Sequence, residues 1–206
     1  MPAPIPDRLA LLPTLPLHSG SHGTFDEGHC AMELVAWLAG EPHSDSPACA
    51  SPVITAFVRS WNDGLPSDED RARILGPLLP RVVGSVGSAA VEEQRAYMAL
   101  DWLIRVHAPA WLDLVESCRP HAAALRALAP IVDVATAHAG DTVDAAGAAA
   151  WDAAGAAARA AAGAAGGDAA GDALRPTVEA LQVSAAELLD RMLSIGDVAT
   201  RKESDE

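Results

Sequence analysis

The chain has 206 residues, of which 28 are acidic and 14 are Lys or Arg, so its formal net charge is −14 at pH 7. This acidity, with no basic run to oppose it, argues against binding to a nucleic-acid duplex or to an anionic membrane surface. The length suits one domain, or one domain with an appendage. The large apolar side chains concentrate in residues 30–135, which can bury a sizeable core.

The cysteine content and the start of the chain bear on the compartment. Three cysteines are few and odd in number, which suits a reducing environment. No uncharged apolar run reaches the length that spans a membrane. A signal peptide is not expected, because the first 17 residues lack a cationic start before an apolar core and are interrupted by Pro2, Pro4, Pro6, Pro13 and Pro16. We therefore expect a cytoplasmic protein.

Residues 1–23 are rich in Pro, Leu, His, Ser and Gly. This composition predicts an extended arm, because proline lacks a backbone donor and disfavours helix at the residue before it. A disordered start is the alternative. The apolar side chains that could hold the arm on a helical surface are Ile5, Leu9, Leu11, Leu12, Leu15 and Leu17.

Helix-capping signals follow the arm. Thr24 and Glu27 have the spacing of a capping box, which predicts a helix over residues 25–39 that ends at Gly40. After a loop, Ser51 and Pro52 have the character of an N-cap and a first helical residue. Further N-cap signatures, at Ser67 and Ser184, predict a helix over residues 68–75 and a helix start near the end of the chain.

The second half of the chain is also predicted to be helical. The most extended apolar periodicity covers residues 89–106 and is interrupted by Pro109. Another helix is expected from Arg119 to about residue 137, with a kink at Pro130. No convincing strand pattern is found.

Residues 144–175 consist of octads that read DAAGAAAW, DAAGAAAR, AAAGAAGG and DAAGDALR. A period of eight drifts around a straight helix, so no continuous apolar stripe forms. We interpret the segment as a linker or a frayed helix, with a packed glycine-faced helix as the alternative. An apolar helix then resumes over residues 176–195, where the stripe Leu181, Leu188, Met192 and Ile195 should dock on the bundle or on a second copy.

The fold class expected from these elements is all-α. The expected organisation is an extended arm at 1–23, a compact helical bundle at 24–138, the Ala/Gly-rich octad region at 139–175, and a C-terminal helix with a mobile tail at 176–206.

The densest chemistry lies between residues 27 and 63. Thiolate, imidazole and carboxylate groups can together bind zinc or iron, and His29 with Glu33 has helical i, i+4 spacing. No C-x-x-C pair is present, so no cofactor is predicted with this cluster, and core cysteines with loop-capping side chains are the structural alternative. The candidate cluster is Cys30, Glu33, His43, Asp45 and Cys49, with Cys30, Glu33 and Cys49 as the metal candidates.

Three charged residues are candidate polar anchors. Arg59, like Glu33, lies inside an apolar helix, and we expect these two charges to pair, since an unpaired buried charge is costly. Asp101 and Arg105 have the i, i+4 spacing of an ordinary helix-surface pair, or of an anchor in a cleft. Common phosphate-binding, serine-nucleophile and zinc-protease motifs are not found.

The run from Cys30 to Asp63, followed by LLPRVVGS and YMALDWLIRVHAPAWLD, resembles an uncharacterised family of bacterial proteins common in high-GC actinobacteria. The family pattern is C-x-M-E, then A-G-E-x-x-S-D-x-P-x-C, then W-N-D. The resemblance covers roughly residues 11–114 and implies no reaction. It implies that Cys30, Glu33, Asp45 and Cys49 matter more than His29 and His43, which weakens a histidine-based metal site. The matching residues are Cys30, Met32, Glu33, Ala39, Gly40, Glu41, Ser44, Asp45, Pro47, Cys49, Trp61, Asn62 and Asp63.

The function favoured by the sequence is that of a non-enzymatic helical interaction or scaffold protein, with self-association as one form of the interaction. Its partner would be a protein or a second copy, without nucleic acid or membrane. The alternative is a small enzyme or metal-binding protein that uses Cys30, Glu33, Asp45 and Cys49.

Overall fold

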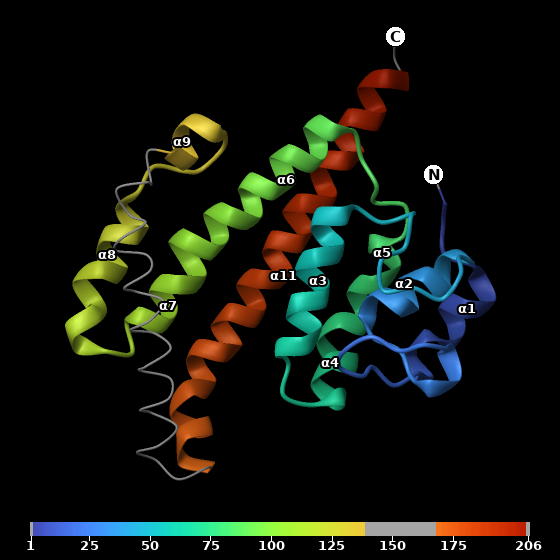
Figure 1. Cartoon of the computed structure of the whole chain (residues 1–206), viewed down its shortest axis with the longest axis horizontal. Helices are drawn as coiled ribbons and strands as arrows, with labels where there is room; N and C mark the ends of the chain where they lie inside the picture. Colours follow the sequence, from blue (N-terminus) through green and yellow to red (C-terminus); the bar gives the residue numbers. More distant parts are fainter. Residues whose placement is uncertain (1, 139–167, 205–206) are drawn as a thin grey trace. The chain divides into compact units, whose positions relative to one another are not determined.

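The computed structural model describes residues 2–138 and 168–204 (Figure 1). These residues form helices without any β-strand, which confirms the predicted all-α fold class. Within the same ranges, no helix has both the length and the apolar character needed to cross a bilayer. Most of the octad segment lies outside the described residues.

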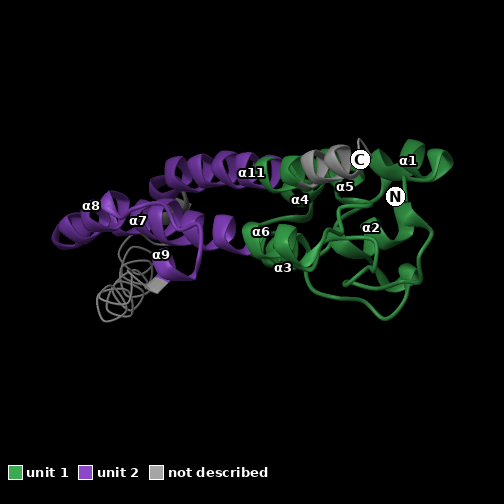
Figure 2. Ribbon diagram, turned by 90° about the horizontal axis from the view of Figure 1, so that it is seen from above, with its two compact units in different colours: residues 1–95, 191–206 green, residues 96–190 purple. Residues whose placement is uncertain are grey.

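The chain forms two compact units (Figure 2). Unit 1 comprises residues 1–95 with 191–206, and unit 2 comprises residues 96–190. The sequence-based division placed residues 24–138 in one bundle and the C-terminal helix apart from it. The observed boundary falls instead within that range, and both units contain part of the C-terminal helix. Helical periodicity shows which face of a helix is apolar, but it does not show which neighbours that face contacts.

Unit 1 is built mostly from short helices. It also contains the first residues of α6 (Ala89–Trp102) and the last residues of α11 (Asp168–Ser204). Its other elements are α1 (Pro6–Leu11), η1 (Leu12–Thr14), η2 (Phe25–Glu27), α2 (Ala31–Ala39), α3 (Pro52–Gly64), α4 (Asp68–Leu75), η3 (Gly76–Leu78) and α5 (Leu79–Val82).

Helix α2 is the centre of unit 1 and packs against α1, α3 and α5. It is apolar around its whole circumference, as expected for a helix covered on every side. The carboxylate of Glu33, in the first turn, is as buried as the neighbouring core residues. The buried residues of this helix are Ala31, Met32, Glu33, Leu34, Val35, Ala36 and Leu38.

The N-terminal arm is not wholly extended, because it contains the short helix α1. Pro6 is tolerated there since the first helical residue needs no backbone donor. The arm is held on α2 by the Ile5 N–H, which donates to Leu38 O at 2.9 Å, and by Arg8, which lies over the Trp37 ring at 5.4 Å. Its buried side chains are Leu12 and Leu17.

The helix predicted over residues 25–39 is interrupted. Residues 25–27 form the single 3-10 turn η2, and α2 begins at Ala31. Gly28 has φ of +139°, outside the helical region and open mainly to glycine, so the chain changes direction there. The predicted capping box of Thr24 and Glu27 does not form, because the Thr24 side chain makes no capping hydrogen bond and the Glu27 carboxylate accepts from the Gly23 N–H. The capping box of α2 is made by Cys30 and Glu33.

The next two predicted caps are confirmed. The Ser51 hydroxyl accepts from the Ile54 N–H at 3.2 Å, with Pro52 as the first residue of α3. The Ser67 hydroxyl accepts from the Asp70 N–H at 3.1 Å at the start of α4. These side chains satisfy donors that a helix start leaves without intrahelical partners.

Unit 2 contains the rest of α6 and the beginning of α11. Its core is formed by Leu112, Cys118, Ala122 and Leu125. Its other elements are the π-helix η4 (Leu103–His107), α7 (Ala108–Leu112), η5 (Glu116–Cys118), α8 (Arg119–Ala127) and α9 (Val134–His138). The helix predicted from Arg119 to residue 137 is therefore two helices, separated by the segment that contains Pro130.

Pro109 changes the predicted long helix without ending it. Proline cannot donate to the carbonyl four residues before it, and its ring crowds that carbonyl. In the structure, α6 passes into the wider π-helix η4 and then into α7, which includes Pro109. A π-helical turn is a rare local feature that apolar periodicity does not reveal.

Helix α11 begins at Asp168, eight residues before the predicted start, and continues through Pro176. Within unit 1, Arg95 Nε donates to Met192 O at 2.9 Å. Within unit 2, Trp102 Nε1 donates to Ser184 Oγ at 3.0 Å. The predicted docking of this helix on the chain is thus observed, and its buried residues are Leu181, Ala185, Leu188, Leu189, Met192 and Leu193.

Candidate functional site

The most unusual polar group of unit 1 is the carboxylate of Glu33, which is 1% exposed. Its Oε2 accepts from the Cys30 N–H at 2.7 Å, the carboxylate half of the capping box. Its Oε1 accepts from the His22 N–H at 2.6 Å, and Oε2 also faces His22 Nδ1 at 2.9 Å. One carboxylate therefore caps its own helix and holds the backbone and the ring of a distant residue.

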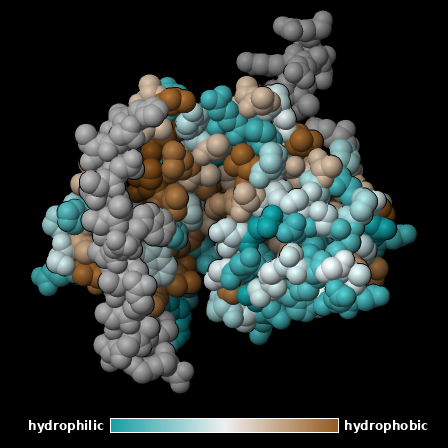
Figure 3. All heavy atoms as spheres, viewed as in Figure 1, coloured by the Kyte–Doolittle hydropathy of each residue, from teal (hydrophilic) through white to brown (hydrophobic). Residues whose placement is uncertain are grey.

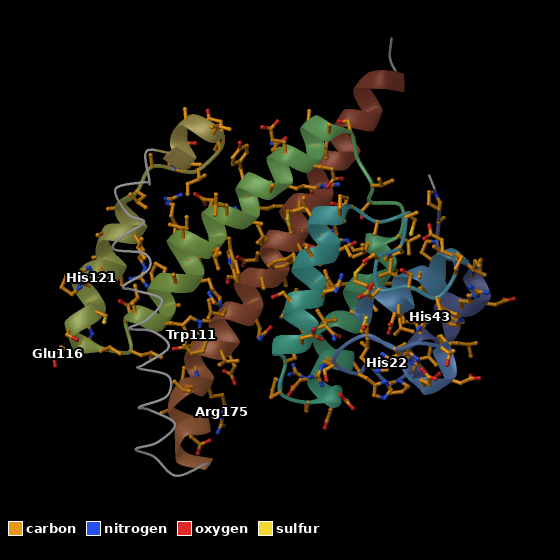
Figure 4. The ribbon with its side chains drawn as sticks, viewed as in Figure 1. His22, His43, Trp111, Glu116, His121 and Arg175 are labelled. Atoms are coloured by element: carbon orange, nitrogen blue, oxygen red, sulfur yellow. The ribbon has the colours of Figure 1, made fainter. Side chains whose placement is uncertain are left out.

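A second histidine, His43, also lies close to the Glu33 carboxylate. His43 Nε2 lies 3.6 Å from Glu33 Oε1 and 3.1 Å from His22 O, to which it donates. His22 precedes α2 in the chain and His43 follows it, and both are labelled in Figure 4. The Nδ1 atom of His43 is buried and has no hydrogen-bond partner among the described residues.

The segment of residues 18–29, here called the clasp segment, is closed by two further histidines. The His18 N–H donates to His29 O at 3.0 Å, and the His29 N–H donates to His18 Nδ1 at 3.3 Å. The segment is also bound to α3, because Asn62 Nδ2 donates to His18 O at 2.9 Å and Asp63 Oδ1 accepts from the Gly20 N–H at 2.8 Å.

Aromatic rings pack beside the carboxylate. The Phe25 ring stacks on His29 at 4.5 Å and on Trp37 at 5.5 Å, and His43 lies edge-on to it at 6.4 Å. Gly28 leaves room for the neighbouring imidazoles, since a Cβ there would lie 2.7 Å from the His22 ring and 3.1 Å from His18 Nδ1. The half-buried rings of Phe25 and Trp37 thus lie beside a group of ionisable side chains, namely Glu33, His18, His22, His29 and His43.

The surroundings of these groups shift their proton affinities. Burial alone would raise the pKa of Glu33, but hydrogen bonds from the His22 and Cys30 N–H groups outweigh burial and lower it. Burial lowers the pKa of His29, and the positive charges that His18 and His22 can carry lower it further. Burial raises the pKa of the Cys30 thiol to about 11. At neutral pH, Glu33 is therefore ionised, and His29 and Cys30 are uncharged.

The predicted pairing of Glu33 with Arg59 is wrong. Arg59 Nη2 lies 3.0 Å from Asp45 Oδ2, and its side chain is 46% exposed. Arg59 Nη1 also donates to Ser46 Oγ at 3.3 Å. A histidine from the clasp segment, rather than a charge from α3, lies against the Glu33 carboxylate.

The predicted five-residue cluster is divided by these contacts. Cys30, Glu33 and His43 come together, whereas Asp45 pairs with Arg59. Cys49 is buried and hydrogen-bonded with Glu41 and with the backbone of Gly84, and burial raises the pKa of its thiol. No described cysteine is in a disulfide, and no three His, Cys, Asp or Glu residues in residues 2–138 and 168–204 are placed to hold a metal.

The third predicted polar pair does form. Arg105 Nη1 lies 3.0 Å from Asp101 Oδ1, with both side chains about one quarter exposed. Asp101 Oδ1 also accepts from the Ile131 N–H at 2.9 Å, so the pair holds the segment that follows α8. This arrangement is an ordinary helix-surface pair with one added structural contact.

A second buried polar centre was missed by sequence reasoning. Arg95 is 1% exposed, and its Nη1 donates to Ser85 O at 2.6 Å and to Glu92 Oε1 at 2.8 Å. The Ser51 hydroxyl donates to Glu92 Oε2 at 2.5 Å. The i, i+3 spacing of Glu92 and Arg95 was a usable signal. For His18 and His22 the sequence offers no comparable signal, because they lie in an irregular segment without periodicity.

Comparisons with known proteins do not identify a relative. No protein-family model matches the chain, and searches of curated proteins and of solved structures found no match. The proposed function therefore depends on the residues and contacts of this chain.

Proposed function

We propose that this protein is a non-enzymatic helical interaction protein that self-associates through an apolar surface of unit 2. The observation that supports this proposal is the exposure of large aliphatic side chains there. Val132 is 62% exposed, Val134 54% and Val183 61%. Figure 3 shows apolar side chains gathered in the area where Figure 1 draws α9 and the adjoining part of α6. Exposed apolar patches on a folded chain commonly mark interaction surfaces.

The central helical stretch of unit 2 supports the same proposal. Every residue from 97 to 105 is half-buried, so no face of this stretch is either fully covered or fully exposed. In α2 of unit 1, by contrast, almost every residue is buried. Covering the apolar side chains of unit 2 with a second copy would remove them from water, at about 25 cal/mol for each Å² of apolar surface.

The use of the Glu33 carboxylate also favours a non-enzymatic role. Both of its oxygens accept from donors of the same chain, and the raised pKa values of Cys30 and Cys49 keep these thiols in the weakly nucleophilic form. The cluster thus contributes to the fold of unit 1. We place the protein in a reducing compartment such as the cytoplasm, which suits three cysteines that form no disulfide.

The charge of the chain gives the proposal a testable salt dependence. Two copies at −14 each repel one another, and added salt screens this repulsion. We expect analytical ultracentrifugation to show association that strengthens with protein concentration and with salt between about 0.05 and 0.5 M. A chain that stays monomeric at high concentration and high salt would contradict the proposal.

A pair of matched variants locates the surface. Val132→Ser with Val134→Ser should weaken association, since both side chains are exposed and their replacement costs little stability. Val86→Ser is the control, because Val86 is 46% exposed but belongs to unit 1. Equal effects of the two changes on association would contradict the assignment to unit 2.

The alternative is a small enzyme or metal-binding protein that uses the Glu33 region. The observation in its favour is the carboxylate–imidazole pair of Glu33 and His22, an arrangement that orients imidazole in acid–base sites. Elemental analysis of the purified protein tests the metal form, since a stoichiometric transition metal would favour it. A Glu33→Gln variant tests the catalytic form, because an active-site charge is often held at a cost in stability and its removal then stabilises the fold.

A further inference from the structure

Residues 128–133 join α8 to α9 in unit 2, and Ile131 ties them to α6. The Ile131 N–H donates to Asp101 Oδ1 at 2.9 Å, and the Ile131 side chain is 4% exposed. Val132 and Val134, which follow Ile131 in the chain, are 62% and 54% exposed. One buried residue therefore anchors a segment whose next two large apolar side chains lie in solvent.

We propose that Asp101 is a positioning residue for self-association. By accepting from the Ile131 N–H, it presents Val132 and Val134 to the same surface of a second copy of the chain. The inference rests on the self-association proposed above. It goes further by naming the residue that holds the interacting segment in place.

The Asp101 carboxylate is itself oriented by Arg105, one turn further along the chain. Arg105 Nη1 lies 3.0 Å from Asp101 Oδ1 and 3.4 Å from Oδ2, and both side chains are about one quarter exposed. A hydrogen bond from a backbone N–H to an ionised carboxylate is stronger than one between neutral groups. The pair thus directs a strong acceptor at the Ile131 N–H.

The start of α9 (Val134–His138) has its own hydrogen bonds, but these act within the segment. The N–H groups of Val132 and Asp133 each donate to Thr136 Oγ1 at 3.0 Å, and the Thr136 N–H donates to Asp133 Oδ1 at 2.7 Å. These contacts fix the two valines relative to α9. Their position relative to α6 depends on the Ile131 contact with Asp101.

The balance of free energies makes this hydrogen bond important. Burial of one isoleucine favours the held segment, whereas fixing the backbone of residues 128–133 opposes it by a free energy of the same order. Loss of a hydrogen bond of ordinary net strength lowers the ratio of held to released segment about fivefold. A copy with a released segment does not present the valines, so apparent association falls with the held fraction.

The test compares the association of the parent chain and of Asp101→Ala by analytical ultracentrifugation. We expect the dissociation constant of the variant to rise at least about threefold, because each of the two copies contributes a held segment. Removing one negative charge from each acidic copy would by itself strengthen association. Weaker association of Asp101→Ala is therefore opposite to the effect of charge alone.

Two control variants separate the acceptor from the charge. In Asp101→Asn the amide oxygen can still accept from the Ile131 N–H, although the charge is lost. Asp113→Ala removes the same charge and a comparable ion pair of unit 2, since Asp113 Oδ2 lies 2.5 Å from Arg126 Nη2. We expect both controls to associate at least as strongly as the parent. An Asp113→Ala or Asp101→Asn chain as weakened as Asp101→Ala would overturn the proposal.

Amide hydrogen exchange at a concentration where the chains are monomeric reports the position of the segment directly. Protection of the Ile131 amide should fall in Asp101→Ala and recover in Asp101→Asn, while the amides of α8 keep their protection. Loss of protection throughout unit 2 in Asp101→Ala would make Asp101 a residue of the overall fold and overturn the proposal. A parent chain that stays monomeric overturns self-association itself. An associating parent with the same dissociation constant as Asp101→Ala overturns this inference alone.

Discussion

At the scale of single residues, the Glu33 carboxylate is bound by the backbone and ring of His22, while Arg59 pairs with Asp45. Glu33 was recognisable because an acid inside an apolar helix needs a reason to be there. Arg59 was the obvious partner, as the other charge in a neighbouring apolar helix. The actual partner, His22, lies in an irregular segment whose path depends on the φ of Gly28 and on hydrogen bonds to α3, and neither has a periodic sequence signal.

Because their surroundings differ, replacing Glu33 and replacing Arg59 should lower the free energy of unfolding by very different amounts. Glu33→Ala removes the acceptor of the Cys30 N–H, which is buried, and of the His22 N–H, which is partly buried. A fully buried donor left without its acceptor costs about 1–3 kcal/mol. Arg59→Ala removes a half-exposed ion pair with Asp45, which is worth at most about 1 kcal/mol. We expect chemical denaturation to give a loss above about 2 kcal/mol for Glu33→Ala and below about 1 kcal/mol for Arg59→Ala.

The double variant is the control for coupling. The two side chains bind different partners, so their effects should add to within about 0.5 kcal/mol. A double variant much less destabilised than the sum would restore the direct pairing of Glu33 with Arg59. Small effects of both single changes would make Glu33 an exposed surface carboxylate, contrary to its burial.

At the scale of helices, capping residues predicted where helices begin better than the sequence predicted where helices are interrupted. The caps at Ser51 and Ser67 were predictable because a side-chain hydroxyl followed by a helix-favouring run is a local signal. The break at Gly28 and the π-helix before Pro109 were not predicted. Apolar spacing marks neither place, and the local geometry depends on tertiary contacts of the flanking residues.

Gly28 should be the most sensitive glycine in unit 1. An alanine there would adopt φ of +139°, and its Cβ would lie 2.7 Å from the His22 ring. Such backbone strain costs about 1–3 kcal/mol, before the displacement of His22 from Glu33 is counted. We expect Gly28→Ala to lower the free energy of unfolding by at least this amount and to increase amide exchange in residues 18–29.

Gly76→Ala is the matched control. Gly76 has φ of −46°, which alanine adopts readily, and a Cβ there would meet nothing within 4 Å. We expect this change to be neutral or to stabilise by up to about 1 kcal/mol, because alanine has fewer conformations than glycine in the unfolded chain. Similar losses for the two variants would show that Gly28 has no special role.

At the scale of the whole molecule, the all-α class could be predicted from the spacing of apolar residues and the absence of alternating strand patterns. Which segments of the chain make up each of the two units could not be predicted in this way. Arg95 and Met192 are 97 residues apart in sequence, and the bond between them brings the last part of α11 into unit 1. The apolar stripe of α11 indicated that the helix is covered, but a stripe does not specify which residues cover it.

The C-terminal helix should therefore be part of the fold in both units. Removing residues 174–206 would expose the partners of Leu181, Leu188 and Leu189 in unit 2 and those of Met192 in unit 1. Losing a buried Leu side chain costs about 2–5 kcal/mol. We expect the truncated chain to bind a hydrophobic dye and to lose more than about 10 °C in Tm, given about 2–4 °C per kcal/mol at this size.

The matched change replaces residues 144–167 with a Gly/Ser sequence of equal length. The octads offer little apolar area beyond methyl groups, so ordering them gains little against a backbone entropy of about 1–2 kcal/mol per residue. Equal length preserves the reach of the connection. We expect Tm to stay within about 4 °C of the parent protein. A truncated chain as stable as the parent would show that α11 contributes little packing energy, whereas a collapse of the linker variant would show that the octads pack against the fold.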